Sequence, residues 1–311
     1  MHEPATTGAA PGYRALRESA GATDLSAWTV LRLRGPDTRA FLQGLASQDL
    51  ESARSGGALP SFFLNEKGRP VALAWVEMGE GGSSAVVIAD EGARSVLRAH
   101  FERFRIMEDV EFEGPEGMPS LIGVAGPNRG QLLREIAKPI PGAISIESAN
   151  LSFLLPPGGP SAAGRPHAAA PHFADPASFE AWRLATGIPR TGIDIDVDRI
   201  ATELSLPEAI SLTKGCYVGQ EVVARTSNRG QVRRHRVGFR FDWNGRPIVA
   251  RAELRAGGVA AGYVTSTAPE PGTDQGLGMG YLTSEALESS AEVHAVEGTA
   301  TRRVRPSPWP L

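Results

Sequence analysis

The sequence contains a single cysteine and no long apolar run. Cys216 is the only cysteine among 311 residues, so the chain cannot form an internal disulfide, and a reducing compartment suits it. No stretch approaches the roughly 18 apolar residues that a membrane-spanning helix needs. The first 20 residues lack the apolar core of a secretory signal, and the acidic Glu3 is unusual in a transit peptide. We therefore expect a cytoplasmic protein without membrane contact.

The formal net charge of -3 argues against a protein whose main partner is nucleic acid. Among the basic residues, lysine is almost as scarce as cysteine is in the whole chain. Lys67, Lys138 and Lys214 are the only lysines among the 32 basic residues, and all the others are arginine. A lysine in a loop of such a chain suggests a need for a compact ammonium with a movable pKa; a solvated turn residue is the alternative.

Strand and helix patterns alternate in the first two thirds of the chain. Residues 27–34 (AWTVLRLR) alternate like a strand, and the following GPDTRAFLQGL predicts a helix with Pro36 in its first turn and Asp37 as its cap. The same order returns in residues 121–136, LIGVAGPNRGQLLREI. The repetition indicates two related lobes, or else only a common strand-to-helix turn. Because the spacing is irregular, the pattern predicts an α+β fold and not a parallel βαβ sheet.

Further elements follow the same rules. Strands are predicted for residues 61–65, 70–78 and 84–90 and for MEDVEFE, and helices for EGARSVLRAHFERF and for Ser178–Thr186. Residues 156–177 are rich in Pro, Gly and Ala and too poor in large apolar side chains to pack, so we expect a surface loop there.

From Val232 onward the chain consists of short strand patterns separated by Gly- and Pro-rich turns. This texture predicts a small C-terminal β-barrel. We place the domain boundary near residue 230, with a first region at 1–230 and the barrel at 231–311. The glycines of GLGMG, residues 276–280, fit a barrel strand better than a dinucleotide-binding turn, because no helix pattern follows them.

The lone cysteine lies in KGCYVGQE, residues 214–221, which we call the signature loop. A single cysteine is most often buried and inert. Cys216, however, lies between Gly215 and Gly219, which favours a turn, and the segment QEVVARTS predicts a helix or strand leaving it. If that segment is a helix, its free amides and the Lys214 ammonium both favour a thiolate. The residues alone leave an inert and a reactive thiol open.

The run KGCYVGQEVVAR resembles the signature of the YgfZ family. These tetrahydrofolate-binding proteins assist iron–sulfur cluster maturation or repair and are related to the aminomethyltransferase of glycine cleavage. The resemblance extends to the segments DLSAWTVLRLRGPDTRAFLQGLASQDL, LNEKGRP, WRLATGIPRTGIDI, AGYVTSTAPEP and GLGMGYL. It implies a GcvT/YgfZ-like fold, with two α+β folate-binding lobes before the barrel, and tetrahydrofolate or a one-carbon derivative as cofactor.

The resemblance also implies which residues carry the function. Cys216 would be a redox thiol or a transient cluster ligand, without a resident metal, and Lys214 would tune it. Trp28 and Phe179 would stack on the pterin, although either ring could be ordinary core. The remaining implied residues shape the loop or contact the cofactor: Gly215, Tyr217, Gly219, Gln220, Glu221 and Arg225 in the loop and its extension, and Lys67 and Arg69 at the cofactor.

Three differences separate the chain from the aminomethyltransferases. Ala72 and Leu73 stand where those enzymes have a pair of aspartates, one of them catalytic. Ala185 stands where they have an acidic residue for the pterin edge, and Cys216 has no counterpart in them. The chain therefore lacks the acid/base group of glycine cleavage, which places it on the YgfZ side of the resemblance.

We therefore expect a folate-binding accessory protein for iron–sulfur cluster assembly or repair, with assembly or client proteins as partners, tRNA-modification enzymes among them. The alternative is a folate-dependent aminomethyl or one-carbon transferase in which Glu66 or Glu221 replaces the missing acid. After the signature loop comes an arginine-rich run without acidic residues. We expect it to form a solvated strand face or, alternatively, to bind the folate carboxylates, a partner or RNA. Its arginines are Arg225, Arg229, Arg233, Arg234, Arg236 and Arg240.

Overall fold

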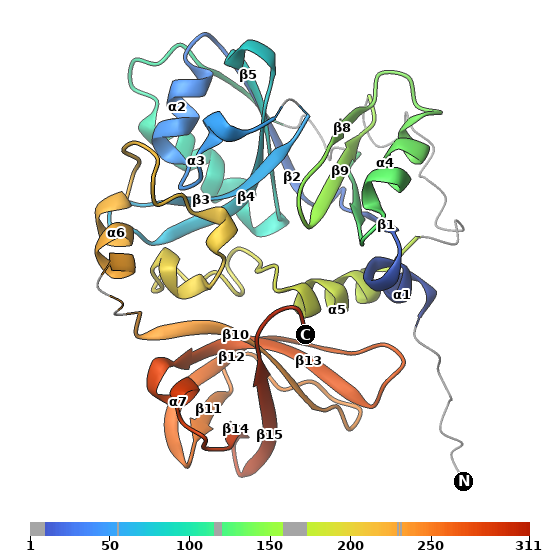
Figure 1. The fold of residues 1–311 in the computed structure, drawn as a ribbon, viewed down its shortest axis with the longest axis vertical. Coiled ribbons are helices and arrows are strands. Elements are labelled where there is room, and N and C mark those ends of the chain that lie inside the picture. Colours follow the sequence, from blue (N-terminus) through green and yellow to red (C-terminus); the bar gives the residue numbers. More distant parts are fainter. Residues whose placement is uncertain (1–9, 55, 115–119, 158–172, 229, 231) are drawn as a thin grey trace.

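The computed structural model describes residues 10–54, 56–114, 120–157, 173–228, 230 and 232–311. Two lobes that each contain a sheet lie side by side, and a β-barrel lies beneath them (Figure 1). Helix α5 (Pro176–Thr186) runs between the lobes and the barrel. Within the described ranges, no helix is both long and apolar enough to cross a membrane.

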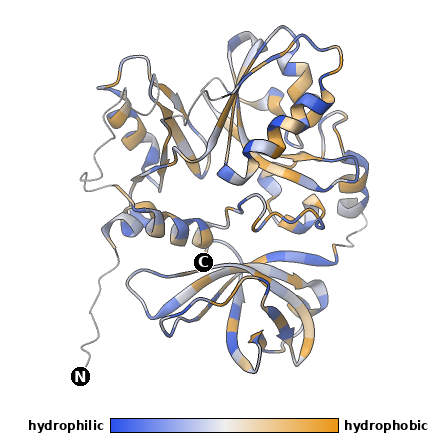
Figure 2. Cartoon of the chain, turned by 180° about the vertical axis from the view of Figure 1, so that it is seen from behind, coloured by the Kyte–Doolittle hydropathy of each residue, from blue (hydrophilic) through white to orange (hydrophobic). Residues whose placement is uncertain are grey.

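The first lobe is an antiparallel five-stranded sheet covered by two helices. Its strand order is β3-β4-β5-β2-β6. The strands are β2 Thr29–Arg34, β3 Ala58–Leu64, β4 Pro70–Met78, β5 Ser84–Ala89 and β6 Glu111–Glu113, with 3₁₀ helices η1 Leu50–Ser52, η2 Glu80–Gly82 and η3 Glu91–Ala93. Helices α2 (Thr38–Leu45) and α3 (Arg94–Phe104) pack Phe41 and Phe101 into one core with Phe63. Figure 2 shows mostly hydrophobic strands in this lobe and a helix α3 that alternates in character.

The start of α2 departs from the sequence-based expectation. The helix begins at Thr38, after Pro36, and the Asp37 side chain does not cap it. Asp37 Oδ2 instead accepts the backbone N–H of Asp109 at 2.8 Å. The carboxylate therefore ties the start of α2 to the segment before β6, a partner that is distant in the sequence.

The second lobe is an antiparallel four-stranded sheet with the order β1-β7-β9-β8. Its elements are α1 Pro11–Glu18, β1 Gly21–Asp24, β7 Ile122–Ala125, α4 Arg129–Ala137, β8 Ile144–Ile146 and β9 Leu151–Leu155. Strand β1 pairs with β7, so the chain starts in the second lobe, builds the first lobe and then returns. In this lobe too, a Gly-Pro step leads from a strand into a helix, as the repeated sequence pattern predicts.

The C-terminal part forms a closed barrel in the order β10-β13-β12-β11-β14-β15. Its elements are β10 Arg234–Asp242, β11 Glu253–Ala256, β12 Val259–Pro269, β13 Gln275–Thr283, α7 Ser284–Glu288, β14 Val293–Glu297 and β15 Ala300–Ser307. On β13, a Cβ at Gly276 or Gly278 would lie 2.4 or 2.2 Å from the rings of Phe241 and Phe239. The predicted barrel is confirmed, whereas the domain boundary near residue 230 stays a prediction.

Helix α5 and the short helices after it connect the lobes to the barrel. Asp175 caps α5 by accepting the N–H of Ser178 at 2.8 Å, and Gly187 ends it with a φ of 82°. The predicted helix is thus confirmed with a start two residues earlier. Most of the predicted loop 156–177 lies outside the described residues. Further along come η4 Ala201–Leu204, η5 Pro207–Ala209 and α6 Gln220–Asn228.

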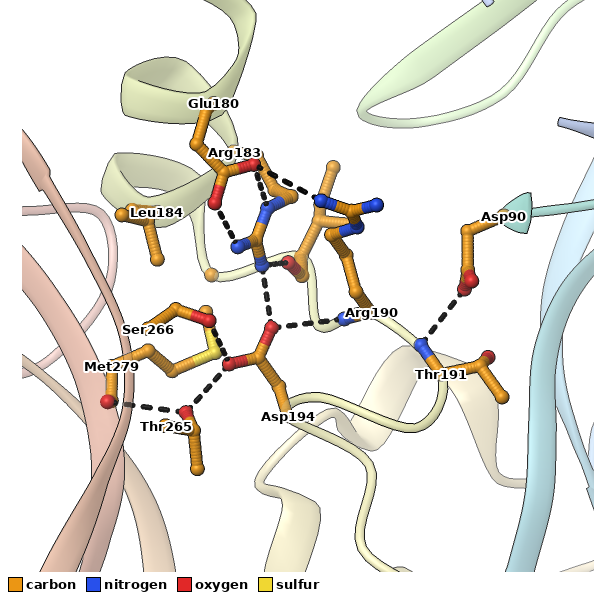
Figure 3. A network of polar contacts seen from close by, with 12 residues as sticks. Asp90, Glu180, Arg183, Leu184, Arg190, Thr191, Asp194, Thr265, Ser266 and Met279 are labelled. Carbon is orange, nitrogen blue, oxygen red and sulfur yellow. Dashed lines mark hydrogen bonds and ion pairs between the residues drawn. The ribbon is translucent and has the colours of Figure 1, made fainter. Parts of the chain in front are cut away.

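A buried ion pair joins α5 to the segment that follows it (Figure 3). Arg183 is 1% exposed and donates from Nη1 to Asp194 Oδ2 at 2.6 Å. Its Nε donates to Glu180 at 2.9 Å. Burial pushes the pKa of Asp194 upward, but the Arg183 guanidinium and hydrogen-bonded hydroxyls outweigh this effect and hold the pKa below its usual value. Asp194 is therefore an anion inside the core.

Asp194 also connects this segment to the barrel. The hydroxyls of Thr265 and Ser266 on β12 donate to its Oδ1 at 2.5 and 2.6 Å. Tyr281 on β13 donates to its main-chain carbonyl at 2.7 Å. One carboxylate thus satisfies donors from α5 and from the barrel at the same time.

The same segment reaches the first lobe. The N–H of Thr191 donates to Asp90 Oδ2, at the end of β5, at 2.9 Å (Figure 3). Next to it, the side chains of Arg190 and Glu91 form an ion pair. Residues 188–196 therefore hold α5, the barrel and the first lobe together, and we call them the bridging segment.

We predict that Asp194→Asn destabilises the whole protein. The substitution removes the fully buried counterion of Arg183 and leaves it only the partly exposed Glu180. Breaking a buried ion pair typically costs about 3 to 5 kcal/mol of unfolding free energy. Asp198→Asn is the matched control, because Asp198 forms an exposed pair with Arg69 and such pairs contribute at most about 1 kcal/mol. Urea unfolding followed by circular dichroism measures both. Equal midpoints for the two variants would contradict the prediction.

Candidate functional site

The turn at residues 65–69 packs directly against the signature loop, residues 214–221. Gly68 and Gly219 face each other with φ values of 67° and 81°. A Cβ on Gly219 would lie 2.6 Å from the Asn65 carbonyl oxygen and 3.0 Å from Cα of Gly68. Only glycine allows this backbone approach. The fold thus brings together two segments that are far apart in the sequence and that the resemblance selects independently.

Lys214 anchors the signature loop to the end of α2. Its Nζ donates to the carbonyl oxygens of Gln43, Ala46 and Gln48 at 2.7, 2.8 and 3.0 Å. Carbonyls at a helix C-terminus lack intrahelical partners and attract a cation. Burial lowers the pKa of Lys214 to about 8, although nearby acids oppose the change, so the amine is mostly protonated at neutral pH. The Lys214 ammonium is thus directed to these carbonyls, and its expected effect on the thiol stays a prediction.

The Cys216 thiol is exposed. Gly215 beside it is exposed as well, whereas Lys214 and Tyr217 on either side are buried. A buried thiol is thereby excluded, whereas the reactivity of Cys216 stays a prediction. A loop with anchored flanks and an exposed centre presents the sulfur to solvent or to a partner on a fixed support.

Helix α6 leaves the signature loop, so of the two predicted continuations the helix is the correct one. Glu221 and Arg225 form an exposed pair at 2.5 Å along this helix. Gln220 Nε2 lies 3.5 Å from the carbonyl oxygen of Lys214, at the base of the loop. Helix α6 thus follows directly from the signature loop, and its residues Glu221 and Arg225 lie on the surface.

Lys67 and Arg69 lie on the turn beside the signature loop. The Lys67 side chain is exposed, and its backbone N–H donates to Asn65 Oδ1 at 3.0 Å. Arg69 is half-buried and pairs with Asp198 at 3.3 Å. The turn therefore carries two cations next to Gly219.

Trp28 and Phe179 are neighbours in a group of five rings where the two lobes meet α5. Their ring centroids are 6.3 Å apart in an edge-on arrangement. Trp28 also lies 5.6 Å from Trp75 and 6.3 Å from Phe153, and Phe179 stacks on Trp182 at 5.5 Å. We call these five rings the aromatic cluster. Trp28 and Phe179 are 7% and 9% exposed, so both rings are also part of the core.

One buried hydroxyl of the apolar core that contains Trp28, Tyr217 OH, has no hydrogen-bond partner among the described residues. Thr29 Oγ1 also lacks a partner there, but Thr29 pairs with Ala89 of β5 and so faces the core of the first lobe, on the other side of the sheet from Trp28. Burial raises the pKa of Tyr217 to about 12, so this phenol stays neutral. Buried polar groups are nearly always partnered. The Tyr217 hydroxyl fits a ligand that carries hydrogen-bond donors and acceptors.

The positions at which the resemblance places the aspartates of glycine cleavage hold no carboxylate. Ala72 and Leu73 are buried within β4, with 0% and 1% exposure. Glu66, a candidate substitute, pairs with Arg103 on the surface at 2.5 Å, and Glu221 is used in the surface pair along α6. Neither carboxylate is buried in the aromatic cluster.

The arginine run after the signature loop does not form a single face. Arg236 is 1% exposed, so the interpretation as a solvated strand face is wrong for this residue. Arg240 pairs with Glu270 at 2.9 Å, and Arg225 lies in the pair along α6. Arg229 lies outside the described residues.

The buried charges could hardly be predicted from local sequence patterns. Arg183 and Asp194 lie in WRLATGIPRTGIDI, a segment that carries part of the family resemblance, and Asp90 ends a strand pattern. An arginine within the apolar pattern of a helix was the signal that could have pointed to Arg183, because a buried charge needs a partner. Asp90 is 3% exposed, and burial raises its pKa.

The chain matches two family models in succession. Residues 2–151 match the GCVT N-terminal domain, and residues 234–310 match the glycine cleavage T-protein C-terminal barrel domain. The chain belongs to the GcvT-like family. The crystal structure of glycine cleavage system aminomethyltransferase T from Bartonella henselae has the same fold as this GcvT-like chain, with a TM-score of 0.80 and 20% identity, covering 96% of this chain and 88% of that one.

Curated relatives of this GcvT-like chain carry different names. The mitochondrial iron-sulfur cluster assembly factor IBA57 of Mus musculus is 26% identical, over 91% of this chain and 86% of its own. An aminomethyltransferase of Rubrobacter xylanophilus is 28% identical, over 96% and 85%. The tRNA-modifying protein YgfZ of Pectobacterium atrosepticum is 25% identical, over 68% and 67%. The resemblance to YgfZ and GcvT-like proteins is thus confirmed.

We predict that Lys214→Met loosens the signature loop. Methionine keeps the length of the side chain but leaves three carbonyl oxygens without their donor, which we expect to cost about 2 to 4 kcal/mol of unfolding free energy. Lys67→Met is the matched control, since Lys67 is exposed and its loss should change stability by less than about 0.5 kcal/mol. Denaturant unfolding compares the two; a Lys214→Met midpoint as high as that of the control would refute this role.

Proposed function

We propose that this protein is a tetrahydrofolate-binding accessory factor for iron–sulfur cluster assembly or repair that acts through Cys216. The observation that carries the proposal is the exposed thiol between the buried Lys214 and Tyr217. Relatives named as an iron-sulfur cluster assembly factor and as YgfZ support it. A cytoplasmic location suits a chain whose only cysteine cannot form an internal disulfide.

The folate pterin would stack on Trp28 and Phe179. The hydroxyl of Tyr217, which lacks a partner among the described residues, would hydrogen-bond its polar edge. Because both rings are largely buried, binding has to move side chains that now cover them. The cations of the turn at residues 65–69 would attract the carboxylates of the folate tail.

An iron–sulfur cluster at Cys216 would be cargo shared with another molecule. Clusters usually take four ligands, and this chain has one cysteine. Within the ranges that the structure describes, no three His, Cys, Asp or Glu side chains gather in a way that could hold a metal ion. The other ligands would therefore come from an assembly or client protein, of which tRNA-modification enzymes are one class.

A folate-dependent aminomethyl transferase is the weaker second candidate. In its favour are an aminomethyltransferase relative that is 28% identical and the buried carboxyl group of Asp90, whose pKa burial raises. Asp90, however, already accepts the backbone N–H groups of Gly92 and Thr191, each at 2.9 Å. Its two oxygens therefore act as a helix cap and as a link to the bridging segment. A transferase mechanism of this kind would also give the exposed Cys216 no role.

The test is rescue of iron–sulfur enzyme activity in cells that lack their own counterpart. Cys216→Ala removes an exposed sulfur, so the variant should fold normally and fail to rescue, with activity at the level of cells carrying an empty vector. Leu212→Ala is the control, since it truncates an exposed side chain just before the signature loop and should rescue fully. Unfolding midpoints of the purified variants confirm that both are folded. Full rescue by Cys216→Ala would overturn the thiol role.

A further inference from the structure

A cavity of about 970 Å³ lies between the end of α5, η5, the first barrel strand and residues 306–310. Its walls are mainly apolar, with Leu206, Val237, Leu287 and Trp309 among them. A space of this size accommodates a small organic molecule. The chain end that contributes to it lies close to α5 in Figure 1.

Arg236 lines this cavity and is 1% exposed. Its Nε donates to the carbonyl oxygen of Leu204 at 2.7 Å and its Nη1 to that of Gly187 at 2.8 Å. Nη1 also lies 3.2 Å from the Met279 sulfur. Nη2 is buried and has no hydrogen-bond partner among the described residues. The guanidinium therefore keeps one unused donor group.

The charge of Arg236 is also uncompensated at short range. Its hydrogen-bond partners are carbonyl oxygens and a thioether, and no carboxylate of the described chain lies within ion-pair distance. Arg183, by contrast, is paired with Asp194. Burial lowers the pKa of Arg236 to about 10, which leaves it charged at neutral pH. A buried cation without an anion is costly, and an anionic ligand would relieve that cost.

We propose that this cavity binds a small organic carboxylate, with the carboxylate on Arg236 Nη2 and an apolar body between Leu206, Val237 and Leu287. Trp309 lies over the guanidinium at 4.3 Å, so this ring shifts when the carboxylate enters. Trp309 is held by a hydrogen bond from its Nε1 to the carbonyl oxygen of Leu184 at 2.9 Å.

The other titratable side chains of the lining are compatible with an anion. Glu208 is exposed, so solvent weakens its charge, although it still acts on Arg236. His235 is half-buried next to Arg236 and can only add positive charge. This site is separate from the aromatic cluster, and the proposal does not depend on folate binding.

Calorimetric titration of the full chain with 2-naphthoate and with its neutral isostere 2-naphthamide tests the proposal. A charge-assisted hydrogen bond to a buried guanidinium favours the acid, so we expect naphthoate to bind at least about tenfold more tightly than the amide. Equal affinities, or no binding of naphthoate, would refute the proposal.

Two variants locate the site without removing the buried arginine, whose loss could unfold the protein. Leu287→Trp fills the cavity from its exposed rim and should abolish naphthoate binding. Val259→Trp makes a comparable change at an exposed position of the barrel outside the cavity and should leave binding unchanged. Retained binding in Leu287→Trp would contradict the assignment.

Saturation with 5-formyltetrahydrofolate separates this site from the folate site, because the folate tail also carries carboxylates. We expect naphthoate affinity to be unchanged by the folate. Competitive loss of naphthoate binding would show that the cavity receives the folate tail, and it would overturn the proposal of a separate site. If folate does not bind at all, the proposed function is contradicted. The cavity proposal is then decided by the naphthoate titration alone.

Discussion

The structure depends on the buried ion pair between Arg183 and Asp194. This pair fixes α5 to the bridging segment, and the same carboxylate receives hydroxyl groups from β12 of the barrel. Since Phe179 is on α5, the pair also sets where that ring meets Trp28 of the first lobe. Buried pairs cost desolvation energy and are stabilising only when all their partners are in place. The satisfied network here therefore makes the relative position of lobes and barrel a specific one.

A second constraint shapes the signature loop. Lys214 extends into the protein, and its ammonium satisfies carbonyls at the end of α2, while Gly219 allows the loop to touch the turn that contains Gly68. Between these two attachments Cys216 remains exposed. Arginine could not replace the lysine easily, because a planar guanidinium does not fit three converging carbonyls as a compact ammonium does. This gives a physical reason for one of only three lysines in the chain.

Local patterns predicted the elements well and the long-range partners poorly. The barrel strands and the end of α5 at Gly187 follow from periodicity and turn chemistry. For the segment after the signature loop the pattern left helix and strand open, and the structure has a helix. Asp37 failed as a cap because its partner, Asp109, comes from a distant part of the chain. For the arginine run a solvated strand face was one of the alternatives, and it is wrong for Arg236 because alternation along a strand does not reveal that both faces of β10 are covered. Residue identity gives a charge, whereas only the fold supplies its partner.

The central claim is that folate is held at the aromatic cluster while the cysteine stays outside it. Titration with 5-formyltetrahydrofolate, followed by tryptophan fluorescence, tests this claim most directly. We predict a saturable change at a single site in the wild-type protein, weakened at least about tenfold in Phe179→Ala, since stacking on one ring contributes about 1 to 3 kcal/mol. Phe104→Ala removes a ring from the separate core of the first lobe, so this variant should bind the folate with wild-type affinity. No saturable signal, or equal affinity in Phe179→Ala and Phe104→Ala, would contradict the account.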